Sequence, residues 1–331
     1  MNKQHLPTYQ DVKEAAERLL GITIRTALLR SVELDRATGG RIWVKPECLQ
    51  LSGSFKIRGA YNRLSTLSED ERRRGVVAFS SGNHGQGVAL AAKLLGIKAT
   101  IVMPKQAPRI KIEKTRSHGA EIVFFDVGTE SREEIAREIA GQRGAVLVPS
   151  FDDAQVMAGQ GTAALEAIED LTVRDVTLDA YVVCAGGGGL MAGTCLAFDA
   201  LSPRTELYTS EPVGHDDHAR SFALGQRQTN AAEAPASFCD ALLVPTPGEL
   251  TFAVNRRYVT GGVAVSDTEV ADAMRFAANH LKLVAEPSGA VALAAVLSGK
   301  IETRGREIGL IITGGNLDAS DFADILTSPK A

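Results

Sequence analysis

The sequence predicts an α/β fold with two open, twisted, mostly parallel sheets that carry helices on both faces. Short apolar segments alternate with longer helical segments along most of the chain, and this alternation is typical of βαβ units. Glycine-rich polar segments follow several of the apolar ones. No low-complexity linker divides the 331 residues, so we expect both sheets to form within one continuous α/β chain.

The apolar segments are rich in Val, Ile, Leu and Phe, as buried parallel strands are. The predicted strands cover 41–45, 76–80, 98–103, 121–125, 145–149, 180–184, 205–210 and 307–313. Between them Ala, Leu, Glu and Arg recur at three- and four-residue spacing, which indicates helices. The clearest predicted helices cover 83–95, 129–142, 154–169, 190–201 and 267–282.

The predicted strands fall into two groups along the chain. Four of them lie between residues 75 and 150, with helices between them. We therefore predict a small inserted α/β domain at 75–150. The flanking segments, 1–74 and 151–331, would together form a larger domain.

Composition and charge point to a soluble enzyme with a small-molecule substrate. Lys and Arg number 36 against 40 Asp and Glu, which argues against nucleic acid or an acidic membrane surface as partner. No apolar run approaches the ~18 residues of a membrane span, and residues 1–9 lack the apolar core of a signal peptide. The 4 cysteines form no Cys-x-x-Cys pair. We expect a cytoplasmic protein with reduced thiols.

Ligands of open parallel sheets bind beyond the carboxyl ends of the strands, where the loops gather. Polar, glycine-rich segments lie at three such ends. They are residues 80–85 after the strand 76–80, residues 186–189 after 180–184, and residues 314–316 after 307–313. We expect these three loops to form one shared site.

The strongest single signal is a run of four glycines directly before the helix 190–201: Gly186, Gly187, Gly188 and Gly189. Bare amides at the start of a helix bind anions, and phosphate suits them best. The same stretch fits a dinucleotide fingerprint ending at Ala192, with Glu211 at the end of the next strand to hold a ribose. An NAD-dependent dehydrogenase is therefore an open alternative here.

A second pattern lies upstream, Ser-Gly-Ser-Phe-Lys-Ile-Arg-Gly-Ala at 52–60, and it contains Lys56. It is followed in order by Ser-Ser-Gly-Asn-His-Gly-Gln-Gly at 80–87, the four glycines, and Thr-Gly-Gly-Asn at 313–316. This series resembles the fold-type II pyridoxal phosphate enzymes over nearly the whole chain. Within them it is similar to the serine and threonine dehydratases, the serine racemases and the 3-hydroxyaspartate ammonia-lyases.

The resemblance implies pyridoxal 5′-phosphate as cofactor, carried by Lys56 as a Schiff base. Once released, Lys56 would take the substrate's Cα proton, and we expect confinement and cationic neighbours to lower its pKa from ~10.4. Asn83 would bind the ring hydroxyl and Phe55 would flank the ring, while the four glycines hold the phosphate. Thr313 would face the ring nitrogen. A neutral hydroxyl there leaves the nitrogen uncharged, which favours elimination over transamination.

The resemblance also implies a substrate side. Ser81 would lie opposite Lys56 and could exchange the Cα proton, as racemisation requires; alternatively it binds the substrate carboxylate with Ser80 and Asn83. Arg132 occupies the position of an arginine that faces the substrate's distal group in racemase-like relatives. If it points inward it would pair with a β-carboxylate; the alternative is a solvated arginine at a helix start.

We therefore expect a pyridoxal-phosphate-dependent ammonia-lyase acting on an L-configured 3-hydroxy amino acid, with 3-hydroxyaspartate converted to oxaloacetate as the leading reaction. Threonine or serine dehydratase and serine racemase are the alternatives within the family. Biosynthetic threonine deaminases carry an additional regulatory domain, for which this chain has no length. We expect a catabolic role and a homodimer, as is usual in the family.

An acidic loop after the strand 205–210 resembles a metal site of the same family. The resemblance implies Glu211, the carbonyl of His215, and Asp217 as ligands of Mg²⁺, or of Ca²⁺ or Mn²⁺, with waters completing the shell. Oxygen ligands of this kind suit hard cations. An ordinary acidic surface loop is the alternative.

Overall fold

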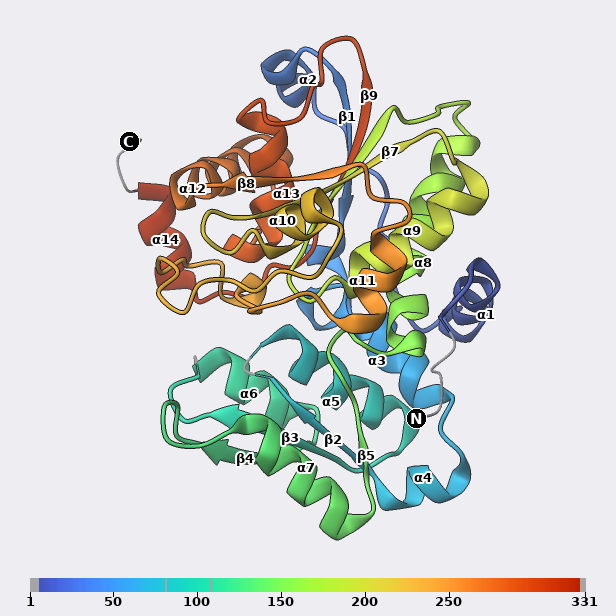
Figure 1. Cartoon of the computed structure of the whole chain (residues 1–331), viewed down its shortest axis with the longest axis vertical. Helices are drawn as coiled ribbons and strands as arrows, with labels where there is room; N and C mark the ends of the chain where they lie inside the picture. The colour runs from blue at the N-terminus through green and yellow to red at the C-terminus, as the bar shows by residue number, and fades with distance from the viewer. Residues whose placement is uncertain (1–5, 81, 108, 328–331) are drawn as a thin grey trace.

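Two parallel sheets organise the chain, one in each of two lobes (Figure 1). The structure, a computed structural model, describes residues 6–80, 82–107 and 109–327. The larger sheet has the order β1-β9-β6-β7-β8, and the smaller has the order β4-β3-β2-β5. Every ladder described within them is parallel. The predicted fold class is confirmed.

The strands of the larger sheet come from both ends of the chain: β1 (Arg41–Pro46), β6 (Ala180–Cys184), β7 (Glu206–Pro212), β8 (Gly261–Val265) and β9 (Glu307–Ile312). Those of the smaller sheet are contiguous in sequence: β2 (Val76–Phe79), β3 (Ala99–Pro104), β4 (Glu121–Phe125) and β5 (Val146–Leu147). The predicted division into an inserted domain at 75–150 and a larger domain from the flanking segments was based on this grouping of the strands.

The helices of the first half of the chain are α1 (Tyr9–Leu19), α2 (Val32–Thr38), α3 (Lys56–Ser65), α4 (Glu69–Arg74), α5 (Asn83–Leu95), α6 (Arg109–Ser117) and α7 (Arg132–Arg143). Those of the second half are α8 (Ala154–Thr172), α9 (Gly189–Leu201), α10 (Asp217–Leu224), α11 (Glu249–Asn255), α12 (Asp267–Phe276), α13 (Pro287–Leu297) and α14 (Ala319–Thr327). No described helix is both long and apolar enough to cross a membrane.

Three elements differ from the sequence prediction. The strand β8 was not predicted, because it opens with two glycines and lies half-buried at the edge of its sheet. The predicted helix 267–282 is α12 followed by a π-helical turn, Ala277–Leu281. The predicted helix 129–142 begins only at Arg132, because Ser131 caps it by accepting a hydrogen bond from the amide of Glu134.

Alternate residues of each buried strand pack on opposite faces of its sheet. In β1, Ile42 and Val44 belong to the core under α12 and α13, whereas Trp43 belongs to the core under α8 and α9. In β2, Val76 and Ala78 likewise lie apart from Val77. This period of two, buried on both faces, is why the strands read as continuous apolar runs.

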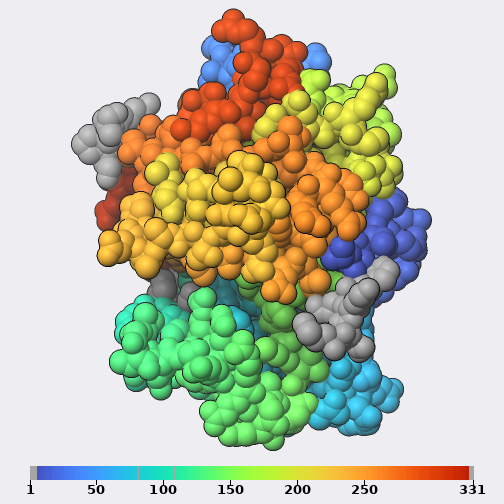
Figure 2. Space-filling view, viewed as in Figure 1, coloured from blue at the N-terminus to red at the C-terminus, as the bar shows by residue number. Residues whose placement is uncertain are grey.

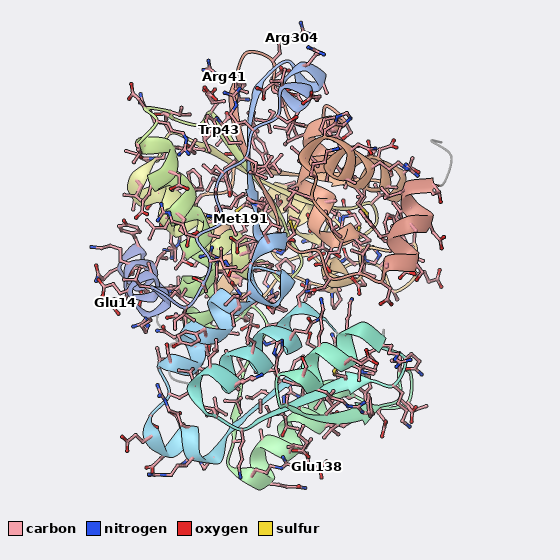
Figure 3. The ribbon with its side chains drawn as sticks, turned by 180° about the vertical axis from the view of Figure 1, so that it is seen from behind. Glu14, Arg41, Trp43, Glu138, Met191 and Arg304 are labelled. Carbon is pink, nitrogen blue, oxygen red and sulfur yellow. The ribbon has the colours of Figure 1, made fainter. Side chains whose placement is uncertain are left out.

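The lobes meet at a narrowed waist in the space-filling view (Figure 2). Seen from behind, Met191 of α9 lies inside the larger lobe, whereas Glu138 of α7 lies at the outer end of the smaller one (Figure 3). Met191 is fully buried. The loops that follow β2, β6 and β9 converge on one cavity between the lobes.

Candidate active site

A cavity of about 800 Å³ lies where the loops of the two sheets meet. Most of the predicted site residues line it. They are Phe55, Lys56, Ser80, Asn83, Arg132, Gly186, Gly187, Gly188, Gly189 and Thr313. Two of the predicted strand-end loops, 80–85 and 186–189, therefore share one cavity, whereas the lining residues described near the third loop, 314–316, include only Thr313 directly before it. Ser81 lies outside the described residues, and Glu211, His215 and Asp217 are not among the lining residues described.

Lys56 is the first residue of α3 and points into the cavity. Its Nζ donates a hydrogen bond to the carbonyl oxygen of Ser150 at 2.9 Å. Burial lowers the pKa of Lys56 to about 8, so the amine is far more often uncharged and nucleophilic near neutral pH than an ordinary lysine. The predicted lowering is present, but burial causes it and the expected cationic neighbours do not.

The glycine loop fits a phosphate. Gly188 has φ +90, a conformation that only glycine adopts freely, and a Cβ on Gly187 would lie 2.1 Å from the ring of Phe151. The amides of Gly186, Gly187 and Gly188 donate to no described acceptor, and α9 begins at Gly189. Free N–H groups at a helix start, with no room for side chains, make an anion cradle.

Asn83 begins α5 and lies between two polar partners. Its amide nitrogen donates to Glu286, and its Oδ1 accepts from Asn316 at 2.8 Å. Burial raises the pKa of Glu286 to about 7. One amide hydrogen of Asn83 is left for a ligand, as binding of a ring hydroxyl would require.

Thr313 follows β9 and makes only neutral contacts in the cavity wall. Its hydroxyl lies 3.4 Å from the Cys184 thiol, and its carbonyl accepts from the amide of Phe55 at 3.1 Å. The Phe55 ring centroid lies 5.2 Å from the Lys56 Nζ. A ring nitrogen beside Thr313 would meet a hydroxyl and no carboxylate, so it would stay unprotonated.

Besides Lys56, four cationic side chains line the cavity, Lys111, Arg132, Arg137 and Arg227. The sequence indicated Arg132 among them. Arg132 lines the cavity from the start of α7, with its guanidinium 5.7 Å from the Phe79 ring. Lys111 of α6 also lines the cavity, is buried, and lies 2.7 Å from the carboxylate of Asp240. This ion pair joins α6 to the segment around Asp240 across the cavity. Its two residues are far apart in the chain, so no local sequence pattern predicts it.

A fourth strand-end loop belongs to this cavity. Ser150, Phe151 and Asp152 follow β5 and line it. The carbonyl of Ser150 accepts the hydrogen bond from Lys56, and the ring of Phe151 packs on the glycine loop. The sequence could have predicted this fourth loop. The predicted strand 145–149 ends directly before it, and ligands of parallel sheets bind beyond the carboxyl ends of the strands.

The acidic loop lies apart from the cavity and is only partly organised as a cation site. Both oxygens of Glu211 accept amide hydrogen bonds, from His218 and Ala219, each at 2.9 Å. Asp217 has one oxygen 2.7 Å from the side-chain nitrogen of Asn230, and its other oxygen is buried without a partner. Burial raises the pKa of Glu211 well above its ordinary value, and that of Asp217 to about 6.

Two further observations bear on this acidic loop. Among the described residues, no three His, Cys, Asp or Glu side chains cluster as a metal site; the predicted ligand set has two carboxylates and a carbonyl, so it remains a prediction. Glu211 is fully buried against α10, so its carboxylate is not placed to hold a ribose. That placement removes the structural basis of the dinucleotide alternative.

Comparison with known proteins settles the family. The model of the family described as "Pyridoxal-phosphate dependent enzyme" matches residues 19–314. This chain belongs to that family. The predicted family and its cofactor, pyridoxal phosphate, are confirmed.

Similar proteins cover nearly the whole chain. An L-threo-3-hydroxyaspartate ammonia-lyase from a Pseudomonas species is 47% identical, covering 97% of this chain and 99% of that protein. An L-threonine ammonia-lyase of Thermotoga maritima is 44% identical, covering 95% of this chain and 76% of that protein. The solved structure of maize serine racemase has a TM-score of 0.91 at 36% identity and covers 97% of each chain. The predicted class of enzyme is confirmed.

Proposed function

We propose that this enzyme converts L-threo-3-hydroxyaspartate into oxaloacetate and ammonia. The observation that carries the proposal is the joint placement of a lysine of lowered pKa, a free glycine amide loop and a neutral threonine in one cavity that Arg132 and Lys111 also line. Relatives named for this substrate occur in a Pseudomonas species and in Saccharomyces cerevisiae, at 47% and 40% identity. A dicarboxylic substrate would find charge-assisted partners in Arg132 and Lys111.

The residues present fit pyridoxal phosphate, and each would hold one part of it. Gly186, Gly187, Gly188 and Gly189 would bind the phosphate through their amides, and Lys56 would hold the aldehyde carbon covalently. Asn83 would bind the ring hydroxyl. When bound, the cofactor withdraws electrons from the substrate's Cα and makes its proton acidic.

Lys56 carries out the proton transfer. Its amine, released when the substrate's amino group takes its place, removes the Cα proton. The β-hydroxyl then leaves as water after gaining a proton. Lys56 resumes its own covalent bond, which frees the substrate's nitrogen as an enamine, and the enamine tautomerises to an imine. Water hydrolyses that imine to oxaloacetate and ammonia, so one water is lost and one is consumed.

A substrate panel tests the assignment. Ammonia release is measured with both 3-hydroxyaspartate diastereomers, threonine and serine, on enzyme whose cofactor has been verified by its yellow colour and by borohydride fixation to Lys56. We expect kcat/KM for L-threo-3-hydroxyaspartate to exceed that for threonine at least about 10-fold, the value of one charge-assisted hydrogen bond. A higher kcat/KM with threonine or serine would contradict the proposal.

Racemisation of serine is a second candidate activity. Serine racemases of Schizosaccharomyces pombe and maize are 38% and 36% identical to this chain, and Ser81 is the residue proposed to exchange the proton on the far face. Chiral chromatography of L-serine incubated with the enzyme tests it. Absence of D-serine during many turnovers of elimination would remove this activity.

A divalent cation at the acidic loop is also proposed, with Glu211, Asp217 and the carbonyl of His215 as ligands. It is supported by two buried carboxylates of which one oxygen lacks a partner. Chelation should lower the melting temperature by a few degrees, and Mg²⁺ should restore it in wild type but not in Asp217→Asn. An unchanged melting temperature would contradict the site.

We further propose that the enzyme works as a cytoplasmic homodimer, as its family resemblance implies. Sedimentation at assay concentration and fractionation of the source cells test the two parts separately. A monomer, or protein found outside the cytoplasm, would contradict the corresponding part.

A further inference from the structure

The carbonyl groups of the glycine loop are held from behind by three side chains. None of the three is among the described residues that line the cavity, and all three are fully buried. Each donates to one glycine carbonyl: His218 Nε2 to Gly186 at 2.8 Å, Thr251 Oγ1 to Gly187 at 2.7 Å, and Asn255 Nδ2 to Gly188 at 3.2 Å.

These bonds determine where the loop's amides point. In a trans peptide the carbonyl of one residue and the N–H of the next point in opposite directions. Three carbonyls fixed behind the loop therefore direct three N–H groups forward, those of Gly187, Gly188 and Gly189. The loop is in this way preorganised as a donor surface, although glycine itself has no conformational preference that would do so.

The helix that carries two of these donors is itself fixed by the cavity wall. Thr251 and Asn255 lie on α11, which has only 7 residues. The carboxylate of Asp152 accepts hydrogen bonds from the first amides of this helix, those of Glu249, Leu250 and Thr251 at 3.1, 2.9 and 3.1 Å. Phe151, the neighbouring residue, contacts the opposite side of the glycine loop. The loop is therefore held between Phe151 and α11.

We propose that His218, Thr251 and Asn255 are positioning residues that set the affinity of the glycine loop for a phosphate ester. The inference rests on the proposed function, because the phosphate is that of the cofactor. None of the three side chains is among the described residues that line the cavity where the cofactor would bind, so they would act through the peptide planes of the loop. Their loss weakens binding of the phosphate group specifically, and leaves contacts to the pyridine ring unchanged.

The test compares two ligands that differ only in the phosphate. Apo-protein is titrated with pyridoxal phosphate and with pyridoxal, and dissociation constants are read from the absorbance of the bound form. Thr251→Val removes the hydroxyl at nearly constant shape and should weaken pyridoxal phosphate about 10-fold, the value of one hydrogen bond at the upper end of its range. Pyridoxal affinity should not change. Thr251→Ser keeps the hydroxyl and should bind both ligands as wild type does.

Matched controls separate positioning from folding. Thr260→Val removes another hydroxyl bonded to backbone in the same lobe, where the amide of Leu207 donates to it at 3.1 Å. This variant should keep wild-type affinity for both ligands. His218→Phe keeps the ring against Phe222, whose centroid lies 5.8 Å away, and should repeat the Thr251→Val result; it decides the matter if Thr251→Val does not fold.

The outcomes are distinct. Equal weakening of both ligands, or unchanged pyridoxal phosphate affinity in the folded variants, overturns the inference and leaves the proposed function standing. If wild type itself binds pyridoxal as tightly as pyridoxal phosphate, the loop is no phosphate site. That result would overturn the proposed cofactor placement together with the inference.

Discussion

Two cations on one helix, Lys56 at the cavity and Arg58 in the core, show how this protein separates chemistry from stability. Lys56 and Arg58 both belong to α3 and face different surroundings. Arg58 is fully buried among carboxylates: it bonds both oxygens of Glu47, each at 2.8 Å, and both oxygens of Glu166, at 2.7 and 2.8 Å. Among the described residues, the one hydrogen-bond partner of the Lys56 amine is the carbonyl of Ser150, at 2.9 Å.

The difference between them is compensation of charge. A buried cation with two carboxylates and satisfied donors keeps its charge and holds segments together. Lys45 belongs to the same network, 2.6 Å from Glu166; burial lowers its pKa, and Glu166 and Glu47 oppose that lowering. Lys56 is half-buried and has no carboxylate partner among the described residues, so it loses its proton more easily, with a pKa lowered to about 8. The uncompensated lysine is the one suited to covalent and acid–base chemistry.

The largest effect is expected from Lys56→Ala. Turnover should fall by at least about 10²–10⁴-fold, the contribution of a positioned base, and further because covalent capture of the cofactor is lost. The melting temperature of the apo-protein should not fall, since the change removes a half-buried, partly desolvated cation that has no carboxylate partner among the described residues. Steady-state assays and thermal unfolding measure the two quantities, with exposed Lys282→Ala as control. Near-normal turnover would remove Lys56 from the mechanism.

Arg58→Ala should show the reverse pattern. Removal of one side of a buried ion network leaves Glu47 and Glu166 uncompensated, so the free energy of unfolding should fall by about 3–5 kcal/mol. Denaturant unfolding measures it. Arg63→Ala, on the same helix with a partly exposed ion pair to Asp153 at 3.0 Å, should cost about 1 kcal/mol or less. An equal loss of unfolding free energy in Arg58→Ala and Arg63→Ala would contradict the distinction between the buried ion network and the partly exposed ion pair.

The pH dependence of cofactor capture sharpens the comparison further. Because the free amine is the nucleophile, the rate at which apo-protein captures pyridoxal phosphate should rise about tenfold per pH unit below the lysine pKa and level off above it. With the pKa of Lys56 at about 8, the plateau should begin near that pH. Stopped-flow absorbance measures the rate. A rise that continues to ~10.4, the ordinary lysine value, would show that burial does not tune this group.

Arg132→Gln should give the smallest of these effects and one that depends on the substrate. If Arg132 binds the distal carboxylate, kcat/KM for 3-hydroxyaspartate should fall about 10-fold while that for threonine changes little. The two substrates serve as each other's control in one enzyme preparation. Equal losses for both would assign Arg132 a general role at the mouth of the cavity.

Local sequence determined the elements and the chemical identity of the site. Side chains return to the same face every two residues in a strand and every 3.6 residues in a helix. The spacing of apolar residues along the sequence therefore predicts both kinds of element. The glycine run and the lysine motif carry chemistry in consecutive residues, and with the family resemblance they predicted Lys56, Thr313 and residues 186–189, all of which line the cavity. The strand β8 was missed because its glycines and half-buried edge position erase that periodicity.

Tertiary structure alone decided what surrounds those residues. The ion pair between Lys111 and Asp240, the cap that Asp152 places on α11, and the bonds from Thr251 and Asn255 to the glycine carbonyls join residues far apart in the chain. No sequence periodicity predicts such contacts, because the packing of whole helices and strands brings the two partners together. The sequence predicts a phosphate-binding loop, but the direction in which its amides point depends on the packing of the whole fold.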